Sequence, residues 1–273
     1  DTRMFNNIKM NVHAEQLNNI PLNDGDLTLF FRVGTDYNNN YYEYEVPLKL
    51  TPKGTYDPNS TDARYQVWPV ENQINFKFSD VTELRNARNN DPRFGYYSDL
   101  NKYSKPFTLA FSGYSMTIVG NPNLGTIKSI MVGIRNPKTT DNMAHCVEAW
   151  INELRLTDFN NSGGWATTGQ LQAKLADLGN VSLAGTYMTP FWGSVDKKIN
   201  ERSKETNATW DMSTSLNMGK FFPSKWKVTL PMFYNFGQTI VTPLFNPLDP
   251  DIRMNDFIGN NNIDDALKDK VLR

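Results

Sequence analysis

The sequence predicts a mainly β protein, in which an antiparallel, jelly-roll-like β-sandwich is followed by a set of longer amphipathic strands. Three observations support this fold class. Apolar side chains recur with a period of two through most of the chain, turn-forming residues separate these runs, and the later runs combine one apolar face with one face of small polar residues. A fold built from helices would instead show a period near 3.6 residues.

The predicted sandwich occupies residues 1–160 and consists of short alternating runs. In the clearest run Tyr42, Tyr44 and Val46 alternate with charged residues, and Pro47 indicates an edge position or a bulge. The same alternation occurs at 27–33, 74–78, 107–111 and 130–134, and turn-rich segments at 36–40, 56–60 and 120–123 separate the runs. A helical spacing occurs only around residues 80–89, where Val81 and Leu84 share a face.

The run at 147–156 would close the sandwich. Its apolar residues change face between Ile151 and Leu154. The slip of phase at Asn152–Glu153 indicates either a β-bulge or a strand that is covered on both faces.

This slip makes four consecutive residues candidates for a structural junction: Asn152, Glu153, Leu154 and Arg155. One interpretation is a hinge or lock that orients the sandwich on the following domain. The other is a solvated charge pair on an ordinary strand, which would contribute little free energy.

The alternating pattern changes after residue 160, at an Asn-, Ser- and Gly-rich segment, because the later runs have polar faces of smaller side chains. The runs at 170–175, 181–187, 208–218 and 228–236 alternate in segments about 9–11 residues long, the length that a tilted strand needs to cross a bilayer. We therefore predict a wall segment of an outer-membrane β-barrel at 161–258, incomplete because four strands cannot close a barrel. A second soluble sandwich with one wet face would show the same alternation.

The wall prediction selects a set of lipid-facing candidates. They are Trp210, Met212, Leu216, Met218, Val228, Leu230 and Met232. Aromatic residues near the predicted strand ends fit interfacial girdles, namely Trp165, Phe191, Trp192, Phe221, Phe222 and Trp226. The remaining residues, 259–273, form a polar helical tail, in which Asn262 or Asp264 would cap the helix.

Composition argues against several classes of function. The chain has 28 Lys and Arg against 29 Asp and Glu, a net charge of -1, so we expect no nucleic-acid partner. Cys146 is the single cysteine and the two histidines are His13 and His145, which leaves little for a metal site or nucleophilic catalysis. The sequence contains no phosphate-binding loop and no nucleophile elbow. The acidic stretch 246–251 fits a rigid turn better than a calcium-binding loop. We expect no enzyme activity, cofactor or metal.

Several motifs, in the same order along the chain, resemble one family. They are residues 40–48, 120–125, 133–137, 150–159 (Trp-Ile-Asn-Glu-Leu-Arg-Leu-Thr-Asp-Phe), 163–166, 175–179, 219–223 and 245–251. Together they resemble the SprA/Sov family, the outer-membrane translocon of the type IX secretion system, which also serves gliding motility.

The resemblance implies an internal fragment of a much longer cell-surface protein that forms one large single-chain barrel in the bacterial outer membrane. It implies a structural role in protein transport without bond chemistry. The implied partners are a PorV-type shuttle barrel, a periplasmic plug, secreted cargo proteins and the lipid bilayer, which the later strands would contact.

An alternative of a different class is a carbohydrate-binding surface protein built from two sandwiches. Exposed loop aromatics would stack on sugars, and the candidates are Tyr37, Tyr41 and Trp68. Core or cross-strand packing also explains aromatic residues at such positions. A glycoside hydrolase is a third alternative, because paired carboxylates meet in space and leave no spacing in the sequence.

Overall fold

The computed structural model describes residues 2–18, 20–94, 102–137, 143–198, 201–261 and 263–272. The predicted mainly β fold with antiparallel sheets is confirmed. The chain forms two compact units, which are described separately. The first comprises residues 1–160, 248–252 and 260–264, and the second comprises residues 161–247, 253–259 and 265–273.

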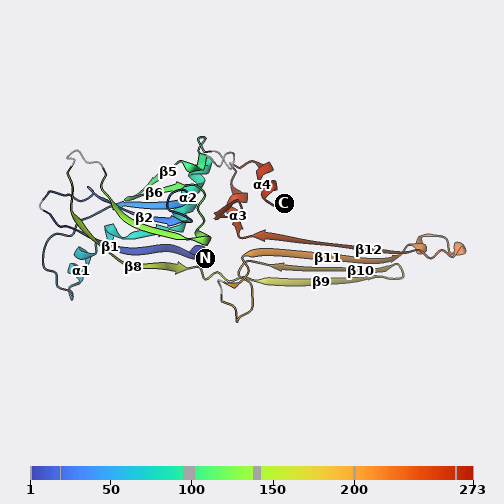
Figure 1. Cartoon of the computed structure of the whole chain (residues 1–273). Coiled ribbons are helices and arrows are strands. Elements are labelled where there is room, and N and C mark those ends of the chain that lie inside the picture. Colours follow the sequence, from blue (N-terminus) through green and yellow to red (C-terminus); the bar gives the residue numbers. More distant parts are fainter. Residues whose placement is uncertain are drawn as a thin grey trace. The chain divides into compact units, whose positions relative to one another are not determined.

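Eight strands form the two sheets of the first unit (Figure 1). They are β1 (Phe5–Gln16), β2 (Thr28–Gly34), β3 (Tyr41–Pro47), β4 (Ile74–Lys77), β5 (Phe107–Phe111), β6 (Tyr114–Val119), β7 (Ser129–Arg135) and β8 (Val147–Phe159). One sheet has the order β4-β1-β8 and the other the order β5-β6-β3-β2-β7. The pairs β1–β8, β2–β7 and β3–β6 are nested, first with last, as in a jelly roll.

The core of this unit lies between the two sheets, because burial follows the alternation of each strand. From β1 the residues Ile8, Met10, Val12 and Ala14 are buried, and from β2 the residues Leu29, Phe31 and Val33. They belong to one hydrophobic cluster that both sheets supply.

Pro47 lies at no bulge, and it has a strand partner on one side only, as at a sheet edge. It is the last residue of β3, which lies between β2 and β6. Its register partner on β2 is Thr28, whereas the pairing of β3 with β6 ends at Glu45. The missing N–H of Pro47 therefore interrupts no ladder on the β6 side.

The described residues of this unit include two α-helices. Helix α2 (Phe78–Asn90) matches the predicted helix and buries Val81 and Leu84. Helix α1 (Thr61–Val67) has no buried residue, and its N-cap is Ser60, whose side chain accepts from the Ala63 N–H.

The second unit contains a four-stranded antiparallel sheet in which consecutive strands are neighbours (Figure 1). Its strands are β9 (Ala166–Leu175), β10 (Gly179–Met188), β11 (Glu205–Asn217) and β12 (Pro231–Pro243). The fourth strand begins later than predicted and extends further. Before it, a 3-10 turn at Ser224–Trp226 and the left-handed Lys227 (φ 49°) reverse the chain, so Val228 and Leu230 lie outside the strand.

The remaining elements are β13 (Phe245–Asn246), β14 (Asp249–Arg253), α3 (Met254–Gly259) and α4 (Asp265–Leu272). Helix α4 lies within the predicted helical tail. Asn262, one of the two expected caps, lies outside the described residues.

Candidate functional site

The register of the four-stranded sheet separates its side chains into an apolar and a polar face. Residues directly opposite each other on antiparallel strands share a face. Leu183 lies opposite Leu171 and Met212, and Met212 lies opposite Phe236. The neighbouring row joins Gln172, Ser182, Ser213 and Asn235. The alternation therefore stays in phase across all four strands.

The apolar face is large and exposed. Its partly or mainly exposed members include Leu171, Leu175, Leu183, Tyr187, Trp210, Met232, Tyr234, Phe236 and Ile240. Leu171 is 64% exposed and Phe236 43% exposed, although both lie in the middle of their strands. An apolar surface of this kind on an isolated sheet indicates an apolar environment or a partner.

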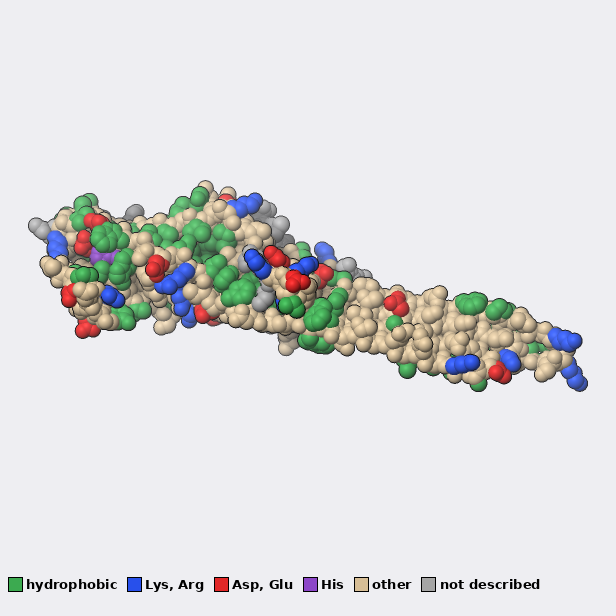
Figure 2. Space-filling view, turned by 90° about the horizontal axis from the view of Figure 1, so that it is seen from below, with side chains coloured by type: hydrophobic (Ala, Val, Ile, Leu, Met, Phe, Trp, Pro, Cys, Tyr) green, Lys and Arg blue, Asp and Glu red, His purple; other side chains and the backbone are tan. Residues whose placement is uncertain are grey.

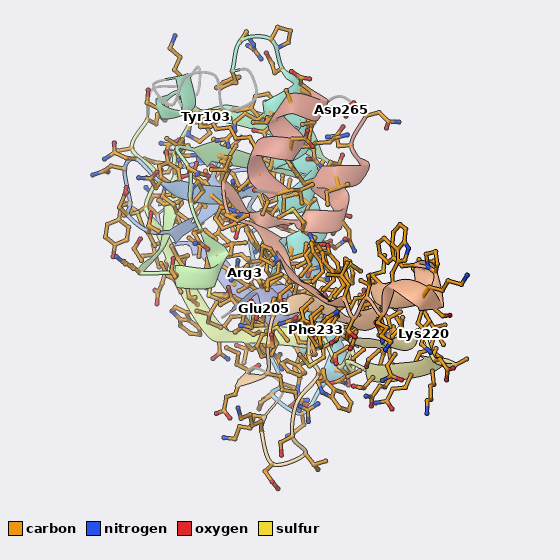
Figure 3. The ribbon with its side chains drawn as sticks, turned by 90° about the vertical axis from the view of Figure 1, so that its right-hand side faces the viewer. Arg3, Tyr103, Glu205, Lys220, Phe233 and Asp265 are labelled. Atoms are coloured by element: carbon orange, nitrogen blue, oxygen red, sulfur yellow. The ribbon has the colours of Figure 1, made fainter. Side chains whose placement is uncertain are left out.

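The polar face carries a ladder of hydrogen bonds between strands. The Ser213 hydroxyl donates to Asn235 Oδ1 at 2.8 Å, and the hydroxyls of Thr209 and Thr239 are 3.2 Å apart. Phe233, labelled in Figure 3, is an exception on this face and is 73% exposed. Small hydroxyl and amide side chains make most of this surface suited to contact with water.

The structure places the lipid-facing candidates on the apolar face, around an apolar hollow and in the connection between β11 and β12. Trp210, Met212, Leu216 and Met232 lie on the apolar face of the sheet. Met218, Leu230 and Met232 line an apolar hollow of about 410 Å³ together with Phe221 and Phe222. Val228 lies in the connection between β11 and β12, where its side chain is 40% exposed.

Aromatic side chains lie at both ends of the sheet. At one end the rings of Trp165 and Tyr187 are 5.3 Å apart, and at the other the rings of Phe222 and Trp226 stack at 6.2 Å. Figure 2 shows basic side chains gathered at the tip of the sheet. Phe191 does not fit an exposed girdle, because it is 6% exposed.

The expected face-to-face partner of a second sandwich does not occur within the described parts of the chain. The sheets described there are the two of the first unit, the four-stranded sheet and the pair β13–β14. Both faces of β12 are exposed up to Val241. A two-sandwich architecture therefore receives no support from these residues.

The predicted bulge in β8 is present. Lys9 pairs with Arg155 and Asn11 with Asn152, so Glu153 and Leu154 face the single residue Met10. Glu153 has a left-handed backbone with φ 59°. Its carboxylate forms an ion pair with Arg155 at 2.9 Å, and both side chains are more than half exposed. Such a pair adds little stability, and a hinge role stays a prediction.

The three aromatic candidates for sugar stacking are not brought together. The Arg32 guanidinium lies 3.9 Å from the ring centre of Tyr41 and covers it. Tyr37 is 45% exposed in the loop between β2 and β3. Trp68 lines a cavity of about 610 Å³ to which neither tyrosine contributes, but which Asn152 and Glu153 also line.

A buried charge cluster surrounds Arg85, and the sequence pattern did not predict it. Its guanidinium is fully buried and forms ion pairs with Asp249 and, at 3.1 Å, with Asp251. Nη1 also donates to Asn121 Oδ1 at 2.9 Å. A signal was present, because Arg85 follows Leu84 on the apolar face of the predicted helix.

This cluster fastens residues 248–252 to the sandwich. The Tyr42 hydroxyl donates to Asp251 Oδ2 at 2.7 Å, and the Leu124 N–H donates to Asp251 Oδ1 at 2.9 Å. Arg3, labelled in Figure 3, donates from Nη1 to the Pro250 carbonyl at 2.6 Å. Burial raises the pKa of the Tyr42 phenol well above its ordinary value, and nearby Asp251 adds to this increase. The acidic stretch at residues 246–251 thus pairs with Arg85 and Arg3 of the same chain.

Within the described ranges, no group of three or more His, Cys, Asp and Glu side chains is placed to hold a metal ion. No described helix is long and apolar enough to span a membrane. His145 and Cys146 precede β8, and the Cys146 thiol is free and exposed.

A family model of known proteins matches most of the chain. Residues 1–258 match the family model SprA_N, described as motility related/secretion protein. A search of curated proteins finds no match. The matched region includes most of both compact units. It runs through β14 and ends one residue before the end of α3. The resemblance seen in the ordered motifs is thereby confirmed. The chain belongs to the SprA_N family of motility-related and secretion proteins.

Proposed function

We propose that the chain is a segment of an outer-membrane protein-secretion channel, the type IX secretion translocon, and that it has a structural role in transport. In this proposal residues 161–258 form part of the channel wall and residues 1–160 form a sandwich module attached to it. Residues 259–273 form a polar tail. The chain performs no bond chemistry.

The observation that carries this proposal is the division of the four-stranded sheet into two faces. The row through Leu183 and Met212 is apolar, whereas the neighbouring row through Ser182 and Ser213 is polar. A barrel wall requires this arrangement, because one face contacts lipid and the other contacts a water-filled interior. Membership of a secretion-related family supports the same role.

The dimensions of the sheet support a membrane position. Strands β9 and β10 have 10 residues each, and β11 and β12 have 13. About 9–11 residues suffice for a tilted strand to cross the hydrocarbon core. The aromatic pairs Trp165–Tyr187 and Phe222–Trp226 would then lie near the two lipid–water boundaries.

The partners follow from the proposed channel. The two edges of the sheet, β9 and β12, would continue into further strands of the same barrel, because open edges do not persist in lipid. A PorV-type shuttle barrel, a periplasmic plug and secreted cargo would contact the complete channel. The bilayer would contact the apolar face.

Membrane fractionation of the full-length parent tests the proposal. Cells would be fractionated, the outer membranes washed with alkaline carbonate, and the protein detected with an antibody to this chain. The proposal predicts retention in the washed outer membrane at a size far above 31.2 kDa. Release of the protein into the wash would contradict a wall role for residues 161–258.

A further inference from the structure

A cavity on the sandwich has the size and lining of a small-molecule site. It measures about 610 Å³, within the range of about 300–1,000 Å³ that is typical of ligand pockets. Its walls combine aromatic residues with polar and charged ones, namely Tyr56, Tyr65, Trp68, Asn11, Gln73, Asn152, Asp57, Arg64 and Glu153. All of these belong to the first compact unit. The proposed channel wall does not use this cavity.

The β-bulge creates one wall of the cavity. In a regular strand, neighbouring residues point to opposite faces, but Asn152 and Glu153 line the same cavity. The bulge at this point redirects the chain, and Glu153 adopts a left-handed backbone that is strained in a residue other than glycine. The strained bulge thus brings the side chains of Asn152 and Glu153 to one wall of the cavity.

The aromatic wall is held in place from behind. The rings of Trp68 and His13 lie 6.0 Å apart, and His13 is 3% exposed. His13 Nδ1 lies 2.7 Å from the Val67 carbonyl and 3.0 Å from the Thr51 hydroxyl. The N–H of Trp68 donates to the Arg64 carbonyl at 2.8 Å and ends helix α1. Trp68 is therefore a fixed platform, whereas Tyr65, 66% exposed, is free to adjust.

The polar wall suits a neutral ligand rich in hydroxyl groups. Amide side chains offer both donors and acceptors, as hydroxyl groups do, and Gln73 Nε2 already orients Asn11 by donating to its Oδ1 at 2.9 Å. Glu153 is paired with Arg155 at 2.9 Å, and the other charged lining residues, Asp57 and Arg64, have opposite signs, so the lining has no excess charge that requires an ionic ligand. A flat indole beside amides matches a pyranose, which has an apolar C–H face and a polar rim.

We propose that this cavity binds a neutral pyranose unit of an oligosaccharide, with Trp68 stacked on the sugar ring and Asn152, Glu153 and Gln73 hydrogen-bonded to its hydroxyls. The sandwich would thus bind a glycan, while the four-stranded sheet would form part of the channel wall. Neither role depends on the other.

Isothermal titration calorimetry on the whole chain tests this proposal. The protein would be kept in a detergent without a sugar headgroup, and titrated with cellohexaose, maltohexaose, laminarihexaose and chitohexaose, and with hexalysine as a cationic probe. We expect saturable binding of at least one hexasaccharide and a loss of affinity of at least tenfold in Trp68→Ala and Asn152→Ala. Trp165→Ala, the same truncation in the second unit, should leave the affinity unchanged.

The variant Glu153→Gly separates binding from folding. Glycine adopts the left-handed backbone without strain, so the melting temperature should stay the same or rise, while the affinity for the sugar falls at least tenfold. Three results would overturn the proposal. They are no binding of any hexasaccharide at about 5 mM, binding that Trp68→Ala leaves unchanged, and tighter binding of hexalysine than of every sugar.

Discussion

The rings of Trp210 on β11 and Phe236 on β12 lie 4.9 Å apart on the apolar face of the four-stranded sheet. They are diagonal neighbours, because the register pairs Trp210 with Gln238 and Met212 with Phe236. Diagonal aromatic contacts stabilise one register, and a slip of either strand by one residue would put the two rings on opposite faces of the sheet. The contact therefore stabilises the register that separates the apolar face from the polar face. The proposed wall role depends on this separation.

A charge on the apolar face should prevent stable insertion. Leu183→Arg places a guanidinium in the middle of the face that we assign to lipid, where the cost is about 2–4 kcal/mol near the bilayer midplane. The amount of full-length parent in washed outer membranes should fall. Ser182→Arg, the adjacent residue on the polar face, is the matched control and should leave the amount close to wild type. Equal losses from both variants would count against the assignment.

The turn between β9 and β10 should tolerate only glycine at position 179. Gly179 has φ 154°, and an added Cβ would lie 2.0 Å from the Ser215 carbonyl oxygen on β11. Gly179→Ala should therefore loosen the pairing of β10 with β11 and speed amide hydrogen exchange in both strands. Gly169→Ala in β9 meets nothing within 4 Å and should leave exchange unchanged. Normal protection in Gly179→Ala would show that this approach is relaxed in solution.

Removal of the buried guanidinium should destabilise the sandwich. Arg85→Met leaves Asp249 and Asp251 buried without their partner, which costs about 3–5 kcal/mol. Urea unfolding of the chain in detergent, followed by near-ultraviolet circular dichroism, measures this change. Arg93→Met removes an arginine whose side chain is 77% exposed and should change the free energy of unfolding by less than about 1 kcal/mol. Similar costs for the two variants would refute the role given to the buried cluster.

The hydrogen bonds that stabilise the loop at residues 36–40 should weaken at acid pH. The N–H of Asn39, above all, and the side-chain amide of Asn40 donate to the Asp36 carboxylate and lower its pKa from 3.8 to about 2. Since the folded pKa is the lower one, this stabilisation is complete above about pH 4 and is lost as the pH falls toward 2. Carbon-13 NMR titration of the carboxyl group, assigned with Asp36→Asn, should show a midpoint near 2. A midpoint near 3.8 would mean that these hydrogen bonds do not persist in solution.

Much of the fold could be predicted because alternation records which side of a strand is buried. The alternating runs that became β2 to β5 and β7 to β12 follow from that rule. The slip of phase in β8 left two interpretations open, a bulge or a strand covered on both faces, and the register shows the bulge. Two strands were missed although they carry the same signal. Ile8, Met10, Val12 and Ala14 alternate in β1, and Tyr114, Met116 and Ile118 alternate in β6.

Other features could not be read from local pattern. Helix α1 buries no residue, so it leaves no apolar periodicity. The pairing of Arg85 with Asp249 joins positions 164 residues apart, and nothing local to either residue specifies it. The cavity that unites Trp68 with Asn152 and Glu153 likewise forms only when distant segments meet.

The measurement that tests the wall assignment most directly is chemical labelling of two adjacent positions in β11. Met212→Cys and Ser213→Cys would be made in the full-length parent, with Cys146 and any other cysteine replaced, and intact outer membranes treated with a charged, membrane-impermeant maleimide. The account predicts rapid labelling at position 213, which faces water, and protection at position 212, which faces lipid. Equal labelling at both positions, or protection at 213 with labelling at 212, would contradict it.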